Sequence, residues 1–430
     1  MMEINKPKHI APLAVLRVAF GLVLLISTIR FMAKGWVHEF YIAPRFFFPF
    51  YGFQWVRPLP AAGMYTVFVL MAVGALCITL GLFYRIASAV FFLCFVYVEL
   101  LDKSYYLNHY YFVTLMSFLL LLVPAHRYFS LDVIRKTALK LTRVPAWMID
   151  MFRLQICLVY FFAGLSKLTH EWLIEAMPLK IWLPAFGGLF KQPWVAYAFS
   201  WSGALFDLTI WIFLLLRPTR KIAYIFVVIF HVLTGWLFKI GMFPYLMIAA
   251  TLVFFPLAFD DEAIGLQTPA RSCNPAFRPR VRIVLPVLGV YFLLQLALPF
   301  RYMLYPGKLS WTEQGFRFSW RVMLMEKGGT AFFYIKDARS HRRWEVVNGQ
   351  FLTPLQERMM VTQPDMILQY AHHLHDVYKK RGINDPVITV EDYVTLNGSG
   401  SRLYLDSTVD LAKEQESFLP KPWILPFRQP

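Results

Sequence analysis

Nine long apolar stretches dominate the first 300 residues of the chain, and polar or basic segments separate them. A helix needs about 20 apolar residues to cross the hydrocarbon core of a bilayer, and these stretches come close to that length. They lie at 11–30, 61–82, 84–101, 109–125, 151–168, 197–216, 221–238, 240–258 and 282–300. The pattern therefore predicts a polytopic α-helical membrane protein with about nine transmembrane helices.

The pattern changes near residue 301, where apolar and polar residues mix. Period-two alternation and flanking turn residues predict strands in GFRFSWRVML (315–324), TAFFYIKD (330–337), HRRWEVV (341–347), PVITVEDYVTL (386–396) and SRLYLD (401–406). Gly328 and Gly329 predict a turn, and residues 363–382 predict one amphipathic helix that ends at Gly382. We therefore divide the chain into a membrane domain at 1–300 and a mixed α/β, strand-rich extramembrane domain at 301–430.

Composition agrees with a membrane domain and decides how the charge is interpreted. Of the 430 residues, 58% are hydrophobic and 18% are aromatic, more than in a typical soluble domain. A formal net charge of +17 can indicate nucleic-acid binding, but here the basic residues lie in short loops between apolar stretches. We therefore expect the lipid bilayer as a partner, and no nucleic acid.

The distribution of basic residues predicts the orientation of the helices. With a cytoplasmic N-terminus, the cytoplasmic side holds Arg85, Arg127, Arg135, Lys136, Lys140, Arg143, Arg217, Arg220, Lys221, Arg271, Arg278, Arg280 and Arg282. The other side holds mainly Lys34, Arg45, Arg57, Lys103, Lys180, Lys191 and Lys239. This imbalance follows the positive-inside rule, and an odd number of spans then places the C-terminal domain in a periplasm or lumen. No small-x-small cleavage site follows Lys6 and Lys8, so we expect a retained first helix.

Cysteine and histidine spacing does not predict a metal site. Cys77, Cys94 and Cys157 lie in apolar stretches and Cys273 lies in a basic loop, so no pair suggests a disulfide framework or metal spacing. His372, His373 and His375 lie close together, but no carboxylate or cysteine stands at ligand spacing from them. We expect packing cysteines and no bound metal.

One charged residue stands at the end of the fifth apolar stretch, in the segment YFFAGLSKLTHEWL at 160–173. In one interpretation Lys167 snorkels, with its stem beside the helix and its ammonium among the lipid headgroups. In the other, Lys167 faces a pocket between helices, where loss of water disfavours the ammonium and leaves a neutral amine as a general base.

A second polar cluster, LDKSYYLNHYY at 101–111, places Asn108 and His109 at the start of a helix. They are either an N-cap and an interfacial residue or parts of a site. The predicted topology brings this helix start and Lys167 to the same outer side, so the three residues are predicted to share one site.

The apolar segment at 230–247 offers a histidine and two possible ligand contacts. His231 either bonds a neighbouring helix or joins the site. Phe243 and Met247 either pack in the core or line a slot for an aromatic ligand.

Eight blocks carry a family resemblance. They are RPLP (57–60), LGLFYRI (80–86), LLDKSYYLNHYY (100–111), HRYFSLD (126–132), VYFFAGLSKLTHEW (159–172), KIGMF (239–243), WTEQGFRFSWRVM (311–323) and DMILQYAHHL (365–374). In these blocks the chain resembles the vitamin K-dependent γ-glutamyl carboxylases and their bacterial homologues with the HTTM domain. The blocks keep their order over nearly the whole chain, which makes the resemblance specific.

The resemblance implies a reaction. In this family the lysine of an AG-x-x-K-L block deprotonates vitamin K hydroquinone, and dioxygen then gives a strongly basic intermediate. That base removes a γ-proton from a glutamyl side chain, carbon dioxide adds to the carbanion, and vitamin K epoxide is released. Lys167 falls on the lysine of this block, and Asn108 and His109 fall on a pair that orients the hydroquinone.

The resemblance, together with the polar and aromatic residues of the apolar segments, gives a set of expected site residues and substrates. Lys167 and His109 are expected to be catalytic, and the expected contacts of reduced vitamin K or menaquinol are Asn108, His231, Phe243, Met247, Trp320 and Met323. Dioxygen and carbon dioxide are the expected co-substrates. The expected partner is an exported glutamate-containing protein or peptide.

The chain departs from the animal enzymes at several positions. Ser166 stands where they often carry a second lysine, Tyr302 replaces a histidine, and Arg321 replaces an acidic residue beside Ser319 and Trp320. The sequence also stops near residue 430, without the large lumenal extension of the animal enzymes. This leaves open a different protein substrate, or none.

Two alternatives to a carboxylase remain open. The first is a quinol epoxidase that carboxylates nothing. The second is a non-catalytic quinone-binding or transport protein in which Lys167 belongs to an ion pathway. Transporters often show paired halves with broken helices, and we find no such internal symmetry.

Overall fold

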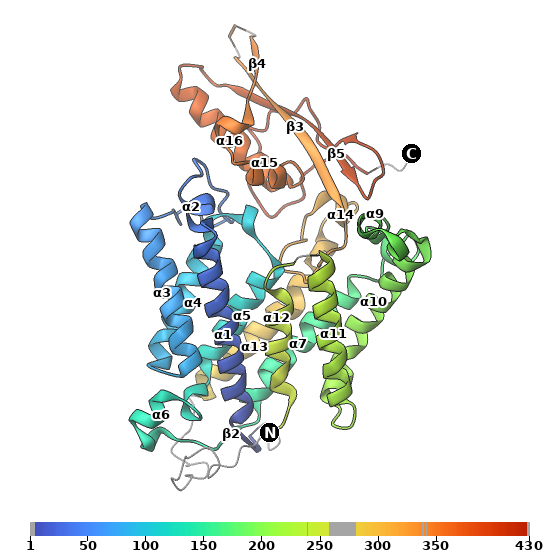
Figure 1. Ribbon diagram of the computed structural model, residues 1–430. Helices are drawn as coiled ribbons and strands as arrows, with labels where there is room; N and C mark the ends of the chain where they lie inside the picture. Colours follow the sequence, from blue (N-terminus) through green and yellow to red (C-terminus); the bar gives the residue numbers. More distant parts are fainter. Residues whose placement is uncertain (1–4, 239, 258–280, 338, 341, 428–430) are drawn as a thin grey trace.

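The structure is a computed structural model that describes residues 5–238, 240–257, 281–337, 339–340 and 342–427. The predicted basic residues Arg271, Arg278 and Arg280, together with Cys273 and Lys239, lie outside these residues. The helices form a bundle, and the strand-containing C-terminal domain stands on one end of it (Figure 1). The N-terminus and the short antiparallel pair β1 (Pro7–His9) and β2 (Arg143–Pro145) lie at the opposite end.

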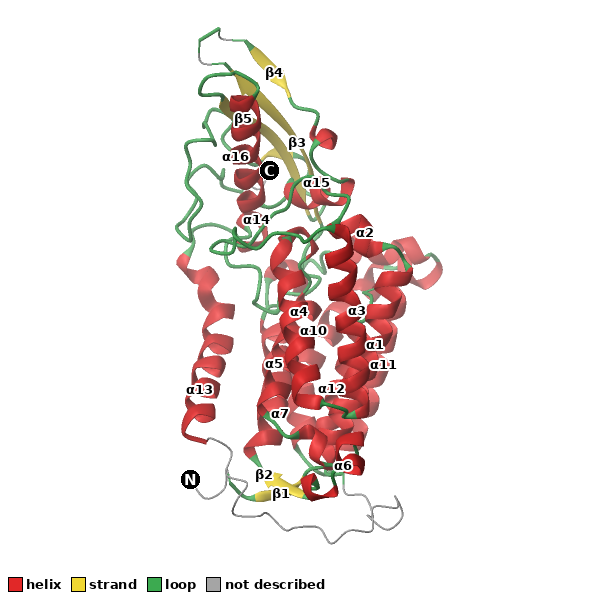
Figure 2. Cartoon of the chain, turned by 90° about the vertical axis from the view of Figure 1, so that its left-hand side faces the viewer, coloured by secondary structure: helices red, strands yellow, loops and turns green. Residues whose placement is uncertain are grey.

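Seven segments in the described part are long and apolar enough to cross a membrane. Their helices are α1 (Ala11–Ala33), α3 (Ala61–Leu80), α4 (Tyr84–Leu101), α7 (Trp147–Leu165), α10 (Pro193–Leu215), α11 (Arg220–Phe238) and α13 (Val281–Ala297). α13 stands beside the bundle (Figure 2) and contacts it through Tyr291, which donates to Gln155 of α7 at 2.7 Å. The prediction of a polytopic helical membrane protein is confirmed.

The other two predicted spans are helical but short, so nine full-length spans are not confirmed. α5 (Asn108–Leu122) has 15 residues and is about 22 Å long at 1.5 Å per residue, less than the hydrocarbon thickness of about 30 Å. α12 (Phe243–Thr251) has 9 residues and is followed by a 3₁₀ turn. α5 ends before Pro124, and α12 begins after Gly241, whose φ of 64° lies in the left-handed region.

Several residues of the predicted cytoplasmic set gather at the end of the bundle away from the C-terminal domain. This end carries α6 (Leu131–Arg135), β2 and the connection between α10 and α11 (Figure 1). These segments supply Arg135, Arg143 and Arg220. The arrangement agrees with the positive-inside prediction, and the orientation itself remains a prediction.

The C-terminal domain is a four-stranded antiparallel sheet packed against helices. The strand order is β4 (Arg343–Glu345), β3 (Lys327–Lys336), β5 (Val387–Leu396), β6 (Arg402–Leu403). Alternate residues of β3 and β5, among them Phe333 and Val390, are buried in one core with Ile367 and Leu374 of α16 (Pro364–Lys380). The other helices after residue 301 are α14 (Leu309–Thr312) and α15 (Pro354–Met360). Three further short helices precede this domain in the chain: α2 (Trp36–Tyr41), α8 (His170–Leu173) and α9 (Leu179–Trp182). The predicted strands near β3 to β6 and the helix at 363–382 are confirmed.

Two predictions in this domain were wrong. Residues 315–324 form turns instead of a strand, and Phe318, Trp320 and Met323 have φ values of 62°, 58° and 57°. The predicted turn at Gly328 and Gly329 lies inside β3. A Cβ atom at Gly329 would lie 2.8 Å from the carbonyl oxygen of Tyr393, so glycine allows the close approach of β5.

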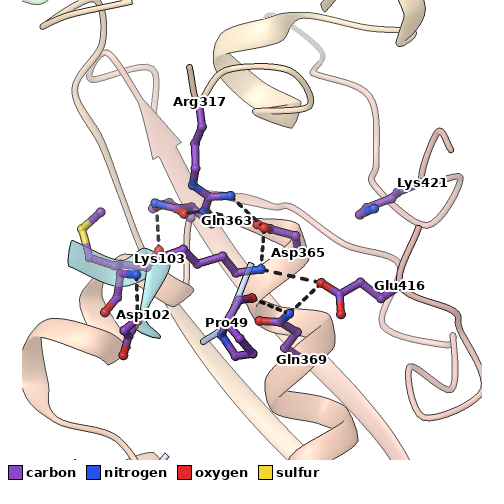
Figure 3. A network of polar contacts seen from close by, with 12 residues as sticks. Pro49, Asp102, Lys103, Arg317, Gln363, Asp365, Gln369, Glu416 and Lys421 are labelled. Atoms are coloured by element: carbon purple, nitrogen blue, oxygen red, sulfur yellow. Dashed lines mark hydrogen bonds and ion pairs between the residues drawn. The ribbon is translucent and has the colours of Figure 1, made fainter. Parts of the chain in front are cut away.

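A polar network joins the two domains (Figure 3). Lys103 Nζ lies 2.7 Å from Asp365 Oδ2, and Arg317 Nη1 donates to the same oxygen at 2.7 Å. Lys103 is only 2% exposed. Burial lowers the pKa of its ammonium, and the nearby Asp365 partly opposes this decrease. Burial alone would raise the pKa of Asp365, but Arg317 and Lys103 hold it well below its usual range. Asp365 therefore stays charged, and the network connects the turn after α4 to α16.

We expect Asp365→Asn to destabilise the protein. It removes the carboxylate that the buried Lys103 and the partly buried Arg317 share, and it leaves Lys103 only Glu416, 3.9 Å away. This costs up to about 3 kcal/mol by analogy with other broken buried pairs. Thermal unfolding of the purified chain in nanodiscs measures the change. Asp376→Asn removes an exposed carboxylate from the same helix and should leave the unfolding temperature unchanged. Equal unfolding temperatures for the two variants would contradict a role of the network at the domain junction.

The pH dependence of stability provides a second test of this junction. Burial raises the pKa of Asp102, which accepts from Ser104 N and Gln356 Nε2, to about 6. A raised folded-state pKa gives stability that is present below the unfolded value of 3.8 and lost as pH rises through about 6. The loss amounts to about 3 kcal/mol at 1.36 kcal/mol per unit. Asp102→Asn should flatten the decline in unfolding temperature over this interval; an unchanged slope would assign the decline to another group.

Candidate functional site

A partly open cavity of about 410 Å³ lies between α7, α10, α11 and the start of α12. The structure brings seven of the eight predicted site residues to it: Asn108, Lys167, His231, Phe243, Met247, Trp320 and Met323. Aromatic and aliphatic side chains form most of its wall, and polar groups are few. Cavities of this kind bind apolar ligands and orient them by a small number of polar contacts.

Lys167 points into the protein. Its Nζ lies 2.6 Å from Asp207 Oδ2 of α10 and 3.3 Å from the carbonyl oxygen of Ala163, and it lies 5.5 Å from the ring centre of Trp172. The side chains of Lys167 and Asp207 are 8% and 7% exposed. This geometry differs from that of a snorkelling lysine, whose ammonium extends to the headgroups.

Close contact between α7 and α10 makes this ion pair possible. Gly164 stands on the last turn of α7, where a Cβ atom would lie 2.6 Å from the backbone nitrogen of Leu208. A glycine here lets the two backbones approach, as small residues do between membrane helices. Lys167 follows Gly164 by three residues, and the close approach of the helices brings it to Asp207 on α10.

His231 has one partner and one free ring nitrogen. Its Nε2 lies 2.9 Å from the hydroxyl oxygen of Tyr160 on α7. Its Nδ1 is buried and has no hydrogen-bond partner in the described part of the chain. His231 thus bonds a neighbouring helix and also lines the cavity, so both sequence interpretations describe part of its environment.

The loop at 313–323 contributes Trp320 and Met323 to the cavity. The Tyr106 hydroxyl accepts from Phe318 N at 2.9 Å and donates to Asn108 Oδ1 at 3.0 Å. Asn108 Nδ2 donates to the carbonyl oxygen of Arg321 at 2.9 Å. Both ends of the Asn108 amide are therefore engaged within the protein, and this residue anchors the loop.

His109, the eighth predicted residue, lines a second cavity of about 480 Å³. Its ring lies 6.2 Å from that of Phe243. The two cavities share Asn108, Phe238, Ile240, Phe243, Val322 and Met323. The structure therefore places Lys167 and His109 in adjacent cavities separated by a common wall.

Sequence reasoning did not single out Asp207, Tyr160 and Trp172, which contact Lys167 or His231 beside the first cavity. Asp207 gave a signal, because a carboxylate inside an apolar stretch of a membrane protein nearly always has a partner. Tyr160 and Trp172 gave none, since aromatic residues are common throughout the chain.

The C-terminal histidines lie apart from these cavities. His372 Nε2 lies 2.8 Å from the carbonyl oxygen of Glu414, and the ring of His373 lies 4.3 Å from that of Phe46. Among the described residues, no three histidine, cysteine or acidic side chains converge as metal ligands would.

The fold and the site define a polytopic membrane protein with a buried lysine–aspartate pair in a largely apolar cavity, covered by an extramembrane domain. Residues 5–259 match the HTTM domain, and residues 280–430 match the lumenal domain of vitamin K-dependent gamma-carboxylase. The chain belongs to the vitamin K-dependent gamma-carboxylase family. No solved structure gives a significant match to it.

The Lys167–Asp207 pair makes a prediction that needs no ligand. Removing one partner leaves a buried charge and should cost about 3 kcal/mol, whereas replacing both by apolar residues should cost much less. We expect Lys167→Met and Asp207→Leu each to lower the unfolding temperature in nanodiscs, and the double variant to recover most of the loss. A double variant as unstable as the sum of the two single variants would contradict a direct ion pair.

Proposed function

We propose that this protein oxidises a membrane quinol, reduced vitamin K or menaquinol, with dioxygen and couples the reaction to carboxylation of glutamate in an exported protein. The observation that carries the proposal is the Lys167–Asp207 pair buried in a cavity of aromatic and aliphatic side chains. Family membership supports the same reaction, because the C-terminal region matches the lumenal domain of the carboxylase.

The cavity residues fit a naphthoquinol. The volume of about 410 Å³ lies within the usual range of ligand cavities, about 300–1,000 Å³. Phe230, Phe243 and Trp320 offer ring faces on which a flat ring system can stack. The unpartnered Nδ1 of His231 offers one hydrogen bond to a quinol oxygen.

Lys167 and Asp207 are suited to take a proton from a quinol hydroxyl. As a pair they carry no net charge, whether the proton they share sits on the amine or on the carboxylate. In the form with a neutral amine, the shared proton sits on Asp207 and Lys167 Nζ is the acceptor of the quinol proton. The resulting ammonium lies 2.6 Å from the protonated Asp207 carboxyl group, and the quinolate left behind is its counter-charge. A phenolic hydroxyl is acidic enough for this amine, whereas the γ-hydrogen of glutamate is not. The oxygenation chemistry that generates a stronger base is supplied by the quinol.

The surroundings of the pair exclude water. Trp172 and Trp320 are 5% and 1% exposed, and Trp320, Val322 and Met323 of the loop at 313–323 line the cavity. A dry site protects a strong base from quenching by water. In the orientation that we propose, with a cytoplasmic N-terminus, the quinol comes from the bilayer and the protein substrate from the outer side.

One assay tests the proposed function. The purified chain in nanodiscs is given reduced vitamin K or menaquinol, dioxygen, labelled bicarbonate and a short glutamyl peptide. We expect quinone epoxide and labelled peptide. Lys167→Ala should abolish both products, because it removes the amine that takes the quinol proton, and an added small amine should restore part of the activity.

Lys191→Ala serves as the matched control, because Lys191 is exposed and lies on the predicted outer side of the membrane. It should keep full activity. Epoxide without labelled peptide would support the quinol epoxidase. Neither product from a folded protein would contradict both enzymes and leave a non-catalytic quinone-binding protein.

A further inference from the structure

A third cavity, of about 130 Å³, lies where the helical bundle meets the C-terminal domain. It is lined by residues of both domains, among them Lys103, Arg301, Asp365 and Lys421, and we call it the junction cavity. It shares no lining residue with the two cavities described above. The proposed reaction therefore gives it no role.

The junction cavity lies at one end of a membrane-crossing segment. Arg301 belongs to the apolar segment from Arg282 to Leu304, which is long enough to cross a bilayer. α13 forms most of this segment, and a 3₁₀ stretch continues it to the C-terminal domain (Figure 2). Close to Arg301 in the chain, Met303 and Leu304 are 66% and 75% exposed. Since apolar residues at the end of a span face lipid, we expect the cavity to lie at the level of the headgroups.

The carboxylates in the wall of the junction cavity already have partners. Asp365 is bound within the polar network. Glu313 Oε1 lies 2.9 Å from Lys327 Nζ. Glu416 Oε1 accepts from Gln369 Nε2 at 2.6 Å. These acids are therefore engaged by groups other than the two cations that remain in the wall.

Those two cations, Arg301 and Lys421, have no carboxylate partner among the described residues. Arg301 Nη2 donates to the carbonyl oxygen of Arg317 at 2.8 Å, and its Nε is buried without a hydrogen-bond partner. Lys421 Nζ donates to the carbonyl oxygen of Ser417 at 3.2 Å, and Figure 3 shows no contact from it to the nearby carboxylates. Their free donors are suited to an anion with several acceptor oxygens, such as a phosphate group.

One rim of the junction cavity is apolar. Phe418 and Leu419 are 68% and 70% exposed, and the ring of Tyr51 lies 4.9 Å from that of Phe418. Water is an unfavourable neighbour for side chains of this kind, whereas the acyl chains of a lipid would cover them. The cavity is smaller than a typical small-molecule site of about 300 Å³. It has room for a headgroup phosphate, and the rest of a lipid would lie outside against the rim.

We propose that the junction cavity binds the phosphate of an anionic phospholipid, with Arg301 and Lys421 as the phosphate ligands and Phe418 and Leu419 against the acyl chains. The bound lipid joins the end of α13 to the C-terminal segment of the extramembrane domain. Phosphatidylcholine would bring its own cation beside these two, so an anionic headgroup such as that of phosphatidylglycerol is preferred. This inference needs neither the quinol nor the protein substrate, so it is independent of the proposed function.

Lipid binding in detergent tests the site. The purified full chain is titrated with phosphatidylglycerol or with phosphatidylcholine, and native mass spectrometry measures the lipid that it retains. The wild type should retain one phosphatidylglycerol more tightly than phosphatidylcholine. Arg301→Gln and Lys421→Gln should each weaken phosphatidylglycerol binding by about fivefold, the amount typical of one basic residue near an anionic lipid surface. Arg301→Lys should retain part of the binding.

A matched control and a folding measurement accompany these variants. Arg57→Gln removes an exposed cation from the predicted outer side and should leave lipid binding unchanged. Thermal unfolding with and without phosphatidylglycerol should show stabilisation by the lipid in the wild type and less in the two variants. If Arg301→Gln fails to fold, Lys421→Gln still tests the site, because its side chain makes a single bond, to a backbone carbonyl.

A competition experiment separates a lipid from a free phosphate ion. Inorganic phosphate should displace phosphatidylglycerol only at far higher concentration, because it has no chains to contact the apolar rim. Leu419→Ser should weaken binding of the lipid and leave binding of inorganic phosphate unchanged. Equal displacement, mole for mole, would assign a phosphate-ion site, and the lipid assignment would be wrong.

Three other results would overturn the inference. The first is a wild type that retains phosphatidylcholine as tightly as phosphatidylglycerol. The second is phosphatidylglycerol binding of wild-type strength in folded Arg301→Gln and Lys421→Gln variants. The third is displacement of the lipid by a short glutamyl peptide, which would assign the junction cavity to the protein substrate. None of these results bears on whether the chain oxidises a quinol.

Discussion

The ion pair between the buried Lys103 and Asp365, 2.7 Å apart, connects the C-terminal domain to the helical bundle. Arg317 binds the same carboxylate, so the loop at 313–323 is held near its middle. From there Tyr106 and Asn108 hold the backbone of Phe318 and Arg321. A second contact, between Lys308 and Glu171 at 2.6 Å, connects the segment before this loop to the turn that follows Lys167. The positions of Trp320, Met323 and Arg321 all depend on these contacts.

The short helices explain why there is space beneath that loop. α5 and α12 begin at Asn108 and Phe243, and these two residues line both cavities. Irregular backbone is tolerated near membrane depth only where protein groups satisfy its polar atoms or where it lines a cavity. The amide of Asn108 and the hydroxyl of Tyr106 do this for the loop at 313–323. The two short helices α5 and α12 thus leave the space in which the cavities form.

Apolar length and period predicted most helices of this fold, because burial in lipid or in a core acts on each segment separately. The alternation in GFRFSWRVML wrongly predicted a strand. The backbone of this segment is held by Tyr106 and Asn108, which lie some 200 residues earlier in the chain. Gly328 and Gly329 wrongly predicted a turn. Only their pairing with β5, which comes later in the chain, shows why glycine is needed in this strand. Lys167 and His231 were visible as polar residues in apolar stretches. The pairing of Lys167 with Asp207 could not be predicted from the sequence, because it depends on how closely α7 and α10 approach at Gly164.

The two cavities differ in charge although they share a wall. Lys167 and Asp207 form a pair that is neutral as a whole, so an uncharged quinol of the kind that we propose would meet no unpaired charge in the first cavity. The second cavity is lined by Arg30 and Arg321 and, within the described residues, by no acidic side chain. Asn108 stands in the wall between them and bonds to the backbone of Arg321, so one side chain sets the separation of the two cavities. A change at Asn108 should therefore alter the surroundings of both Lys167 and Arg321.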